Sequence, residues 1–233
     1  MHRLLVDTAL LSEEAPVLPA DAARHLRVVR PKDGEQVELF DGHGSFRAYV
    51  WFGGALRAQS DRRTIGRPND SLTLFACVTK GSRWDWTIEK ATELGASRIV
   101  PVISDRTIVR IPKAERAAKR ERWMRIAEDA ARQSDAKWLP EIAEAVDFAD
   151  VLALVRETKC LIGALTDPPS PLISTASGNA VFIGPEGDFT PDELTALMSV
   201  ATPVSFGSTI LRAETAAIFA LSVLRTEVLK SCC

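Results

Sequence analysis

The chain has 233 residues, 46% of them hydrophobic, which suits one large domain or two small ones with a full core. Its apolar runs are too short to span a membrane, and no basic-then-apolar signal segment opens it, so we expect a cytoplasmic protein without a membrane partner. Its four cysteines form no CxxC pair and no Cys/His cluster, which argues against a metal site and a disulfide framework. The net charge of −2 is uneven, since residues 71–137 carry +5 and residues 138–233 carry −7.

The first 70 residues are expected to form a small β-barrel domain. Turn sequences such as Asp41-Gly42-His43-Gly44 separate short runs of strand-forming residues. The expected strands are Arg3–Val6, Gln36–Phe40, Phe46–Phe52 and Leu56–Ile65. One short helix fits Asp21–Val29, with Asp21 as its N-cap and Pro31 beyond its end. The segment Arg67-Pro68-Asn69-Asp70-Ser71 is typical of a linker, which places a domain boundary after residue 70.

From residue 72 onward, strand and helix patterns alternate, as in an α/β layer fold. The uncharged run Leu72–Thr79 is typical of a buried parallel strand. A helix follows it, with Ser82 as its N-cap and Gly95 as a left-handed stop after Leu94. The later expected strands are Arg98–Ser104, Glu141–Val146 and Cys160–Leu165, and the later expected helices are Lys113–Gln133 and Phe148–Thr158. Residues 71–233 are therefore expected to form the second domain.

The helix Lys113–Gln133 and the loop before it are strongly basic. Between Arg106 and Arg125 the sequence has eight basic and two acidic side chains. Trp123 and Ile126 belong to an apolar stripe, which leaves the basic side chains mostly toward solvent. Such a face is a candidate for binding RNA phosphates, although charged helix faces are more often only solvated.

A tight turn follows the apolar strand Ala180–Ile183. The sequence Gly184-Pro185-Glu186-Gly187-Asp188 contains two glycines, which adopt backbone angles that other residues avoid. Thr190 and Glu193 have the spacing of a capping box, so a helix should begin directly after the turn. Glycine geometry alone would also explain this pattern, so the turn by itself points only weakly to a ligand site.

The same order of elements repeats after residue 201. Thr202–Phe206 is an expected strand, Gly207–Arg212 a loop, and Thr215–Leu224 a helix that is apolar on nearly every side. Arg212 and Glu214 lie beside this apolar helix, where charged side chains are seldom found without a partner or a function. They form either part of a ligand site or a structural ion pair. Because open α/β sheets bind ligands at the carboxyl ends of their strands, we expect both loops to line one site.

Two motifs near the end of the chain carry a family resemblance. Ile183-Gly184-Pro185-Glu186-Gly187 and Gly207-Ser208-Thr209-Ile210-Leu211-Arg212-Ala213-Glu214-Thr215, in this order and about twenty residues apart, resemble those of the RsmE family. The shorter segments His25–Arg30, Phe40-Asp41-Gly42, Lys80-Gly81, Ile88–Gly95 and Ser104-Asp105-Arg106 are also similar to it. The chain departs from the family pattern at Asp188, where glycine is usual, and at Asp105, where glutamate is usual. It departs again at Glu128–Lys137, where the family favours Gln followed shortly by Gly-Arg.

The resemblance implies an S-adenosylmethionine-dependent enzyme of the SPOUT class that methylates N3 of a uridine in 16S ribosomal RNA, within the small ribosomal subunit. It implies a SPOUT-type α/β domain with a trefoil knot in residues 71–233, preceded by a small PUA-like β-barrel RNA-binding domain in residues 1–70. It also implies a homodimer, with which the all-round apolar helix Thr215–Leu224 agrees.

The resemblance places the cofactor in three loops. The implied cofactor-binding residues are Leu165, Ile183, Gly184, Pro185, Glu186, Gly187, Phe206, Gly207, Ile210 and Leu211. Arg212 would stabilise charge on the uridine carbonyl oxygens; Glu214 would orient Arg212 or act as the base, and Glu186 is the other candidate base. The candidate RNA-binding residues are Arg24, His25, Arg27, Arg30, Arg106, Arg120 and Arg122, and no metal is implied.

Other functions are less compatible with the sequence. A nicotinamide dehydrogenase would need a G-x-G-x-x-G motif after a strand, and a P-loop hydrolase would need G-x-x-x-x-G-K-[ST]; the sequence has neither. The remaining alternative is a non-catalytic RNA-binding protein with a degenerate methyltransferase domain. The intact GPEG and LRAET motifs argue against it.

Overall fold

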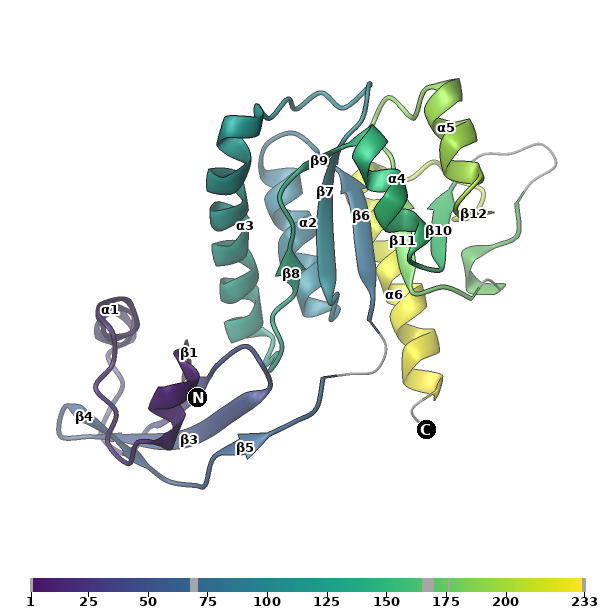
Figure 1. The fold of residues 1–233 in the computed structure, drawn as a ribbon. Helices are drawn as coiled ribbons and strands as arrows, with labels where there is room; N and C mark the ends of the chain where they lie inside the picture. The colour runs from purple at the N-terminus through teal and green to yellow at the C-terminus, as the bar shows by residue number, and fades with distance from the viewer. Residues whose placement is uncertain (1, 68–70, 165–169, 176, 232–233) are drawn as a thin grey trace. The chain divides into compact units, whose positions relative to one another are not determined.

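The structure is a computed structural model that describes residues 2–67, 71–164, 170–175 and 177–231. The chain divides into two compact units, which Figure 1 draws as ribbons. The first unit comprises Met1–Pro68 and Glu128–Leu139, and the second comprises Asn69–Ala127 and Pro140–Cys233. The units thus differ from the expected ranges 1–70 and 71–233 chiefly in the segment Glu128–Leu139, which packs with the amino-terminal residues.

A five-stranded sheet organises the first unit. β1 (His2–Leu5) pairs in parallel with β2 (Gln36–Phe40), and β3 (Ser45–Phe52) pairs antiparallel with β2. β4 (Ala55–Ala58) and β5 (Arg63–Thr64) both pair antiparallel with β3. The expected strand Leu56–Ile65 is therefore two short strands. Between them, the carbonyl of Ser60 accepts a hydrogen bond from the side chain of Arg47 (Nε, 2.7 Å).

One helix, α1 (Ala20–Val29), buries Ala22 and Leu26 in the core of the first unit, which also contains a 3-10 turn at Thr8–Ser12. The prediction that Asp21 is the N-cap was wrong, because Pro19 takes that position. Asp21 lies in the first turn instead, where a negative charge still favours the helix dipole. The helix ends at Arg30 in a left-handed conformation (φ 52°).

Arg3 of β1 connects the segment Glu128–Leu139 to the sheet of the first unit. Its Nη1 donates to the carbonyl of Ala131 (2.5 Å), and its Nε donates to Glu38 Oε1 (2.8 Å). Lys137 Nζ donates to the same Glu38 oxygen (2.5 Å). Arg3 and Glu38 are both buried, and removing one partner of a buried pair leaves an uncompensated charge. This segment is therefore an integral part of the first unit.

Two glycines of the turn between β2 and β3 are explained by the same segment. Gly42 and Gly44 have φ angles of 72° and 92°, which strongly favour glycine. A Cβ on Gly42 would lie 2.6 Å from the Leu139 side chain, and a Cβ on Gly44 would lie 2.7 Å from the Trp138 ring. The turn is therefore built to receive residues 138 and 139.

A seven-stranded parallel sheet organises the second unit. The strand order is β12-β10-β11-β6-β7-β8, and β9 also pairs with β7. The strands are β6 (Thr73–Cys77), β7 (Arg98–Ile103), β8 (Glu141–Ile142), β9 (Val146–Asp147), β10 (Cys160–Gly163), β11 (Ala180–Ile183) and β12 (Thr202–Val204). Because β10, β11 and β12 are adjacent and parallel, the loops that follow them start at the same edge of the sheet.

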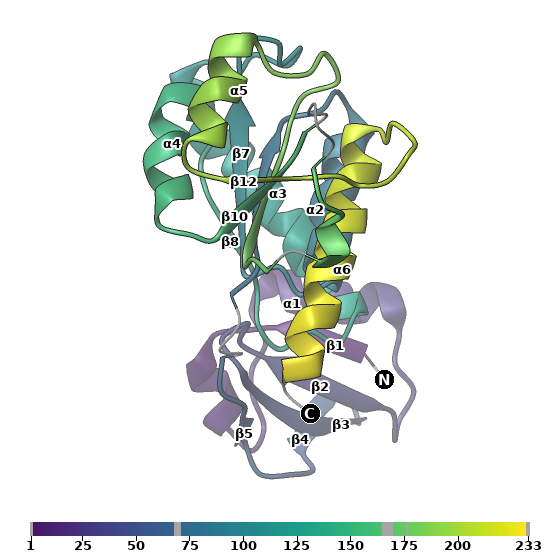
Figure 2. The same ribbon diagram turned by 90° about the vertical axis from the view of Figure 1, so that its right-hand side faces the viewer.

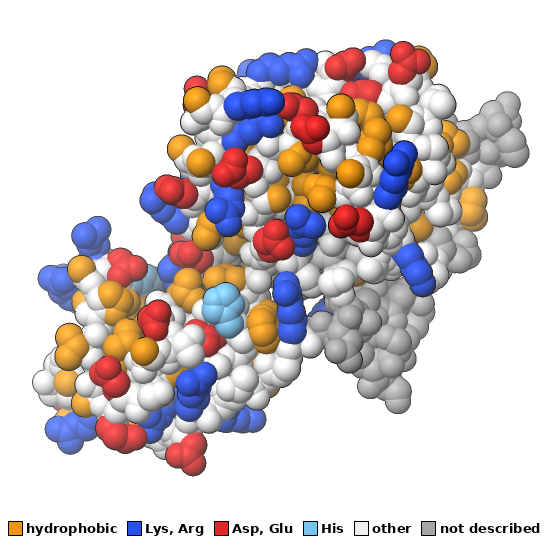
Figure 3. All heavy atoms as spheres, viewed as in Figure 1, with side chains coloured by type: hydrophobic (Ala, Val, Ile, Leu, Met, Phe, Trp, Pro, Cys, Tyr) orange, Lys and Arg blue, Asp and Glu red, His pale blue; other side chains and the backbone are white. Residues whose placement is uncertain are grey.

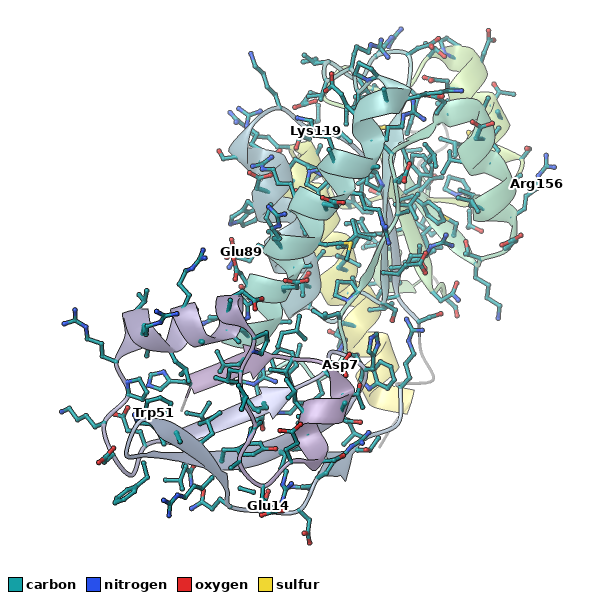
Figure 4. The ribbon with its side chains drawn as sticks, turned by 60° about the vertical axis from the view of Figure 1, so that its left-hand side comes forward. Asp7, Glu14, Trp51, Glu89, Lys119 and Arg156 are labelled. Carbon is teal, nitrogen blue, oxygen red and sulfur yellow. The ribbon has the colours of Figure 1, made fainter. Side chains whose placement is uncertain are left out.

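Helices cover both faces of this sheet, as Figure 2 shows. The helices are α2 (Ser82–Glu93), α3 (Lys113–Gln133), α4 (Phe148–Arg156), α5 (Pro191–Met198) and α6 (Ala213–Ser231), with a short 3-10 turn at Ile173–Thr175. Leu74 and Ala76 of β6 pack in a core with α2, α6 and the part of α3 in this unit. Phe75 and Cys77 alternate with them and pack with α4 and α5 on the other face. Lys119 on α3 and Arg156 on α4 lie on opposite sides of the sheet in Figure 4.

Most local expectations for the second unit match the structure. Helix Lys113–Gln133 and strand Ala180–Ile183 have the predicted bounds, and the capping box of Thr190 and Glu193 is confirmed. Gly95 has the predicted left-handed conformation (φ 78°). Ser82 is the first helical residue, and Gly81, not Ser82, is the N-cap. The expected strand Glu141–Val146 consists of the two short strands β8 and β9.

Both cysteines in the described residues, Cys77 and Cys160, are free and buried. Burial raises the pKa of the Cys77 thiol to about 11 and that of Cys160 to about 12, so both stay protonated near neutral pH. In the same part of the chain, His, Cys, Asp and Glu side chains form no group of three that could hold a metal ion. Nor does any helix there have the length and apolar character needed to cross a membrane.

Candidate active site

A cavity of about 470 Å³ lies where β10, β11 and β12 end, and we call it the strand-end cavity. Its walls come from the end of β10, the loop after β11 (the first loop, residues 184–189), the loop after β12 (the second loop, residues 205–212) and the start of α6. The lining residues are Gly163, Ala164, Phe182, Ile183, Gly184, Pro185, Glu186, Asp188, Phe189, Val204, Ser205, Phe206, Gly207, Thr209, Ile210, Leu211, Arg212, Ala213 and Ala216. This is the position at which open α/β sheets bind ligands.

The first loop has a fixed conformation. Asp188 N donates to the carbonyl of Pro185 (3.0 Å), which closes the turn. Arg106 Nη1 donates to the carbonyls of Gly187 (3.0 Å) and Phe189 (3.3 Å). Gly184 lies so close to Phe189 that a Cβ there would be 2.9 Å from the ring. Contacts from outside and inside the loop therefore fix this wall of the cavity.

Asp188 has a left-handed backbone conformation, with φ 61°. Glycine adopts this conformation without strain, which accounts for the glycine usual here in the family. Aspartate is among the few other residues found in it, because its short side chain bonds locally. Here Asp188 Oδ1 accepts a hydrogen bond from Phe189 N (2.8 Å). The departure from the family pattern thus preserves the turn.

The helix after the first loop is also anchored. Glu193, at the start of α5, is buried, and its Oε2 accepts from Thr190 N (3.0 Å) in the capping box. Its Oε1 accepts from Asp105 N (2.8 Å), which lies beyond the end of β7. One carboxylate therefore connects the first loop and α5 to the end of β7, which lies two strands from β11 in the sheet.

The second loop is more open than the first. Gly207 has φ 116°, and a Cβ added to it would meet no atom within 4 Å, so its conformation, rather than crowding, favours glycine. Ile210 is 89% exposed although its side chain is large and apolar. Phe206 packs inward, since a Cβ on Gly163 would lie 2.3 Å from its ring. Gly163 therefore leaves room for the aromatic ring that forms one wall.

Of the candidate catalytic residues, Arg212 and Glu186 line the cavity, whereas Glu214 does not. The side chain of Glu214 is 13% exposed, and its Oε2 is buried without a hydrogen-bond partner. The structural ion pair of Arg212 with Glu214 is absent from the described residues. Glu214 instead faces Arg83, whose Nε lies 3.7 Å from Glu214 Oε1, and Arg83 Nη1 lies 3.7 Å from Glu186 Oε1.

Arg83 was not identified from the sequence. It lies in the first turn of α2, more than a hundred residues before either glutamate. One signal was present, because a cation in the first turn opposes the helix dipole. Its partners, however, depend on how α2, the first loop and α6 converge, which no local pattern predicts.

The cavity brings most of the candidate cofactor residues together. Ile183, Gly184, Pro185, Glu186, Phe206, Gly207, Ile210 and Leu211 all line it. Gly187 is not part of the wall, and its carbonyl binds Arg106. Leu165 lies outside the described residues.

The candidate RNA-binding residues are distributed over both units. Arg24 and Arg27 on α1 and Arg30 directly after it surround a hollow of about 580 Å³, and His25 is exposed on the same helix. In the second unit, Arg120 Nε donates to the carbonyl of Ile142 (2.7 Å). Two further residues also have protein partners, since Arg122 pairs with Asp85 and Arg106 binds the first loop. Figure 3 shows Lys and Arg side chains interspersed with Asp and Glu on the visible face.

The sequence matches a family model described as an RNA methyltransferase domain over residues 67–225. A ribosomal RNA small subunit methyltransferase E from Bacillus subtilis is 32% identical, and the match covers 99% of each chain. A protein of the same name from Synechocystis is also 32% identical, over 95% of this chain and 76% of that relative.

Solved structures agree with these matches. Ribosomal RNA small subunit methyltransferase E from Neisseria gonorrhoeae, bound to S-adenosyl methionine, is 28% identical, with a TM-score of 0.82 over 97% of this chain and 98% of that one. A probable rRNA-methyltransferase from Porphyromonas gingivalis is 29% identical, with a TM-score of 0.77 over 100% and 99% of the two chains. The chain therefore belongs to the family of RNA methyltransferases that includes ribosomal RNA small subunit methyltransferase E.

Proposed function

We propose that this protein is an S-adenosylmethionine-dependent methyltransferase that acts on N3 of a uridine in 16S ribosomal RNA. The observation that carries the proposal is the strand-end cavity, because both sequence motifs contribute its walls. Family membership supports the reaction, since the relatives from Bacillus subtilis and Synechocystis are named for methylation of small-subunit ribosomal RNA. The relative from Neisseria gonorrhoeae, whose structure contains S-adenosyl methionine, supports the cofactor.

The residues of the cavity fit this cofactor. A volume of about 470 Å³ lies within the usual range for small-molecule sites, about 300–1,000 Å³. Phe206, Ile210 and Leu211 offer apolar surface for an adenine ring, and the backbone of the first loop offers polar groups for its edge. Glu186 supplies a negative charge at the wall, which is favourable near a cationic ligand. We assign the cofactor to the strand-end cavity, held by the first and second loops.

The chain's own residues have two tasks in the reaction. Bound S-adenosylmethionine supplies an activated methyl group. The protein must remove the proton from uridine N3 and stabilise the negative charge that spreads over the flanking carbonyl oxygens. Arg212 is exposed at the cavity and has no partner among the described side chains, so its guanidinium is free to bind those oxygens. Glu186 is the better-placed base, since Glu214 does not reach the cavity wall.

We further propose how the two units serve this reaction. The first unit would be a PUA-like RNA-binding domain that contacts phosphates through Arg24 and Arg27 on α1 and Arg30 directly after it. The second unit would be a SPOUT domain with a trefoil knot. The packing of α6 against α2 and β6, which lie far earlier in the sequence, is compatible with a threaded chain.

We also propose a cytoplasmic homodimer. Phe219 on α6 is 39% exposed, and its ring lies 6.0 Å from that of Phe206, at the cavity. An aromatic side chain of this kind is suited to an interface with a second copy. The proposal of a non-catalytic RNA-binding protein is less compatible with a cavity lined by both motifs.

The test is ligand binding followed by product analysis. S-adenosylmethionine and its demethylated product should raise the melting temperature, and NAD should not. Small-subunit particles treated with enzyme and cofactor should contain a methyl group on uridine N3, identified by mass spectrometry of the nucleosides. Gly163→Ala should weaken binding because its Cβ would collide with the Phe206 ring. Gly66→Ala is the matched control, since nothing lies within 4 Å of its Cβ position. A shift with NAD alone would contradict the proposal.

A further inference from the structure

Arg83 lies between two carboxylates from different parts of the second unit. Its Nη1 is 3.7 Å from Glu186 Oε1 in the first loop, and its Nε is 3.7 Å from Glu214 Oε1 at the start of α6. Arg83 itself lies in the first turn of α2. Three elements that are distant in the sequence therefore meet at one guanidinium, beside the strand-end cavity.

Stability does not explain the position of Arg83. Its side chain is 46% exposed, and ion pairs of exposed groups contribute little to the free energy of unfolding. Both distances are too long for hydrogen bonds, so the pairs are held by charge alone. A cation in the first turn also opposes the dipole of α2. The position is unfavourable for the helix and only weakly favourable for the fold.

The two carboxylates differ in their position relative to the strand-end cavity. Glu186 lines the cavity, and its side chain is 26% exposed. Glu214 is more deeply buried and is not part of the cavity wall. Glu214, outside the cavity wall, can therefore anchor the guanidinium of Arg83, and this guanidinium can orient the carboxylate of Glu186 at the wall. Without a cation between them, the two negative charges would repel each other.

We propose that Arg83 is a positioning residue for methyl transfer, which Glu214 anchors and which orients the carboxylate of Glu186 at the cavity wall. This inference rests on the proposed function. It predicts that Arg83 acts on the reaction through Glu186 rather than independently.

The test is a double-mutant cycle with Arg83→Gln, Glu186→Gln and the double variant. Each single variant should lower the single-turnover rate on the order of tenfold or more, and the double variant should be no slower than Glu186→Gln alone. Arg83→Lys should recover part of the rate, because it restores the charge without the planar fork. Arg156→Gln is the matched control, since Arg156 is exposed at the end of α4, on the other face of the sheet, and should keep the normal rate.

Binding and unfolding are measured in parallel. Arg83→Gln should leave the melting temperature nearly unchanged, and calorimetry should show cofactor affinity within about threefold of normal, because the cavity walls are intact. Rate effects that multiply in the double variant would overturn the inference, as would a normal rate for Arg83→Gln. If Arg83→Gln does not fold, its role is structural and the inference also fails. A wild-type protein without methyl transfer would instead overturn the proposed function.

Discussion

The two loops that line the strand-end cavity are built in different ways. The first loop is fixed by Arg106, by its own closing bond and by the buried Glu193 behind it. In the second loop, Ser205 is held by backbone hydrogen bonds with Pro171 and Ile173. The side-chain hydrogen bonds described for this loop are local, between Ser205 and Gly207, and Ile210 is almost fully exposed. The first wall is therefore held along its length, whereas the second is held at Ser205 and Phe206 and has few contacts beyond them.

This difference indicates that the two loops have different roles in ligand binding. A fixed wall can present backbone groups to a cofactor at little cost in ordering. A wall with few contacts belongs to the least stable part of a structure, from which ligand-binding loops are often drawn. Arg212 lies at the end of the second loop, directly before α6. The following predictions test this contrast, from the largest effect to the smallest.

Loss of Arg212 should have the largest effect. Arg212→Ala should lower the single-turnover rate on the order of a hundredfold, as the loss of one preorganised donor to a developing negative charge does elsewhere. Cofactor affinity and melting temperature should change little, because Arg212 is exposed and the first loop is intact. Arg212→Lys should recover only part of the rate. A normal rate for Arg212→Ala would show that Arg212 has no part in the chemistry.

Removal of the anchor behind the first loop should mainly reduce stability. Glu193→Ala removes the buried carboxylate that accepts hydrogen bonds from Asp105 N and Thr190 N, which should lower the free energy of unfolding by about 1–3 kcal/mol. Chemical denaturation measures this change. Asp192→Ala, at the neighbouring exposed position of the same turn, should cost much less. Equal effects would mean that the first loop is not anchored through Glu193.

A variant of Arg106 distinguishes a structural role in the first loop from a role in RNA binding. Arg106→Ala removes the donor to Gly187 and Phe189, so cofactor affinity measured by calorimetry should fall about fivefold, the scale of one hydrogen bond. Arg110→Ala is the control, because Arg110 donates to the carbonyls of Ser104 and Asp105 and not to the first loop. If Arg106→Ala weakens RNA binding and leaves cofactor affinity unchanged, its contact with the loop is incidental.

Asp188 should show the smallest effect. Asp188→Ala places a side chain without local hydrogen bonds in a left-handed conformation, at a cost of about 1 kcal/mol in unfolding free energy. Asp188→Gly should be close to neutral, since glycine adopts the same angles without strain. Denaturation of the two variants in parallel provides the comparison. If Ala and Gly behaved alike, the backbone of the first loop would be less constrained than its contacts indicate.

The sequence predicted elements whose signals are local. The bounds of α3 and β11 and the capping box of α5 depend on neighbouring residues, and all three were predicted. The two loops could be placed at one edge of the sheet because parallel strands end there. Arg83 and the segment Glu128–Leu139 were missed, since their roles depend on contacts with residues about a hundred positions away. The sequence showed that Asp188 replaces the usual glycine, but it could not show that Asp188 adopts the same left-handed conformation (φ 61°).

The position of Arg3 has a consequence for how the protein is made. The buried guanidinium of Arg3 pairs with Glu38, but its Nη1 and Nη2 donate to the carbonyls of Ala131 and Ala136, so these donors lack their acceptors until that segment has been synthesised. During translation, the first unit therefore cannot complete its folding when residues 1–68 have been made, but only after residues 128–139 have also been synthesised. A fragment that ends at residue 70 would expose Gly42 and Gly44 where Trp138 and Leu139 belong, and it should populate unfolded states far more than the full chain does.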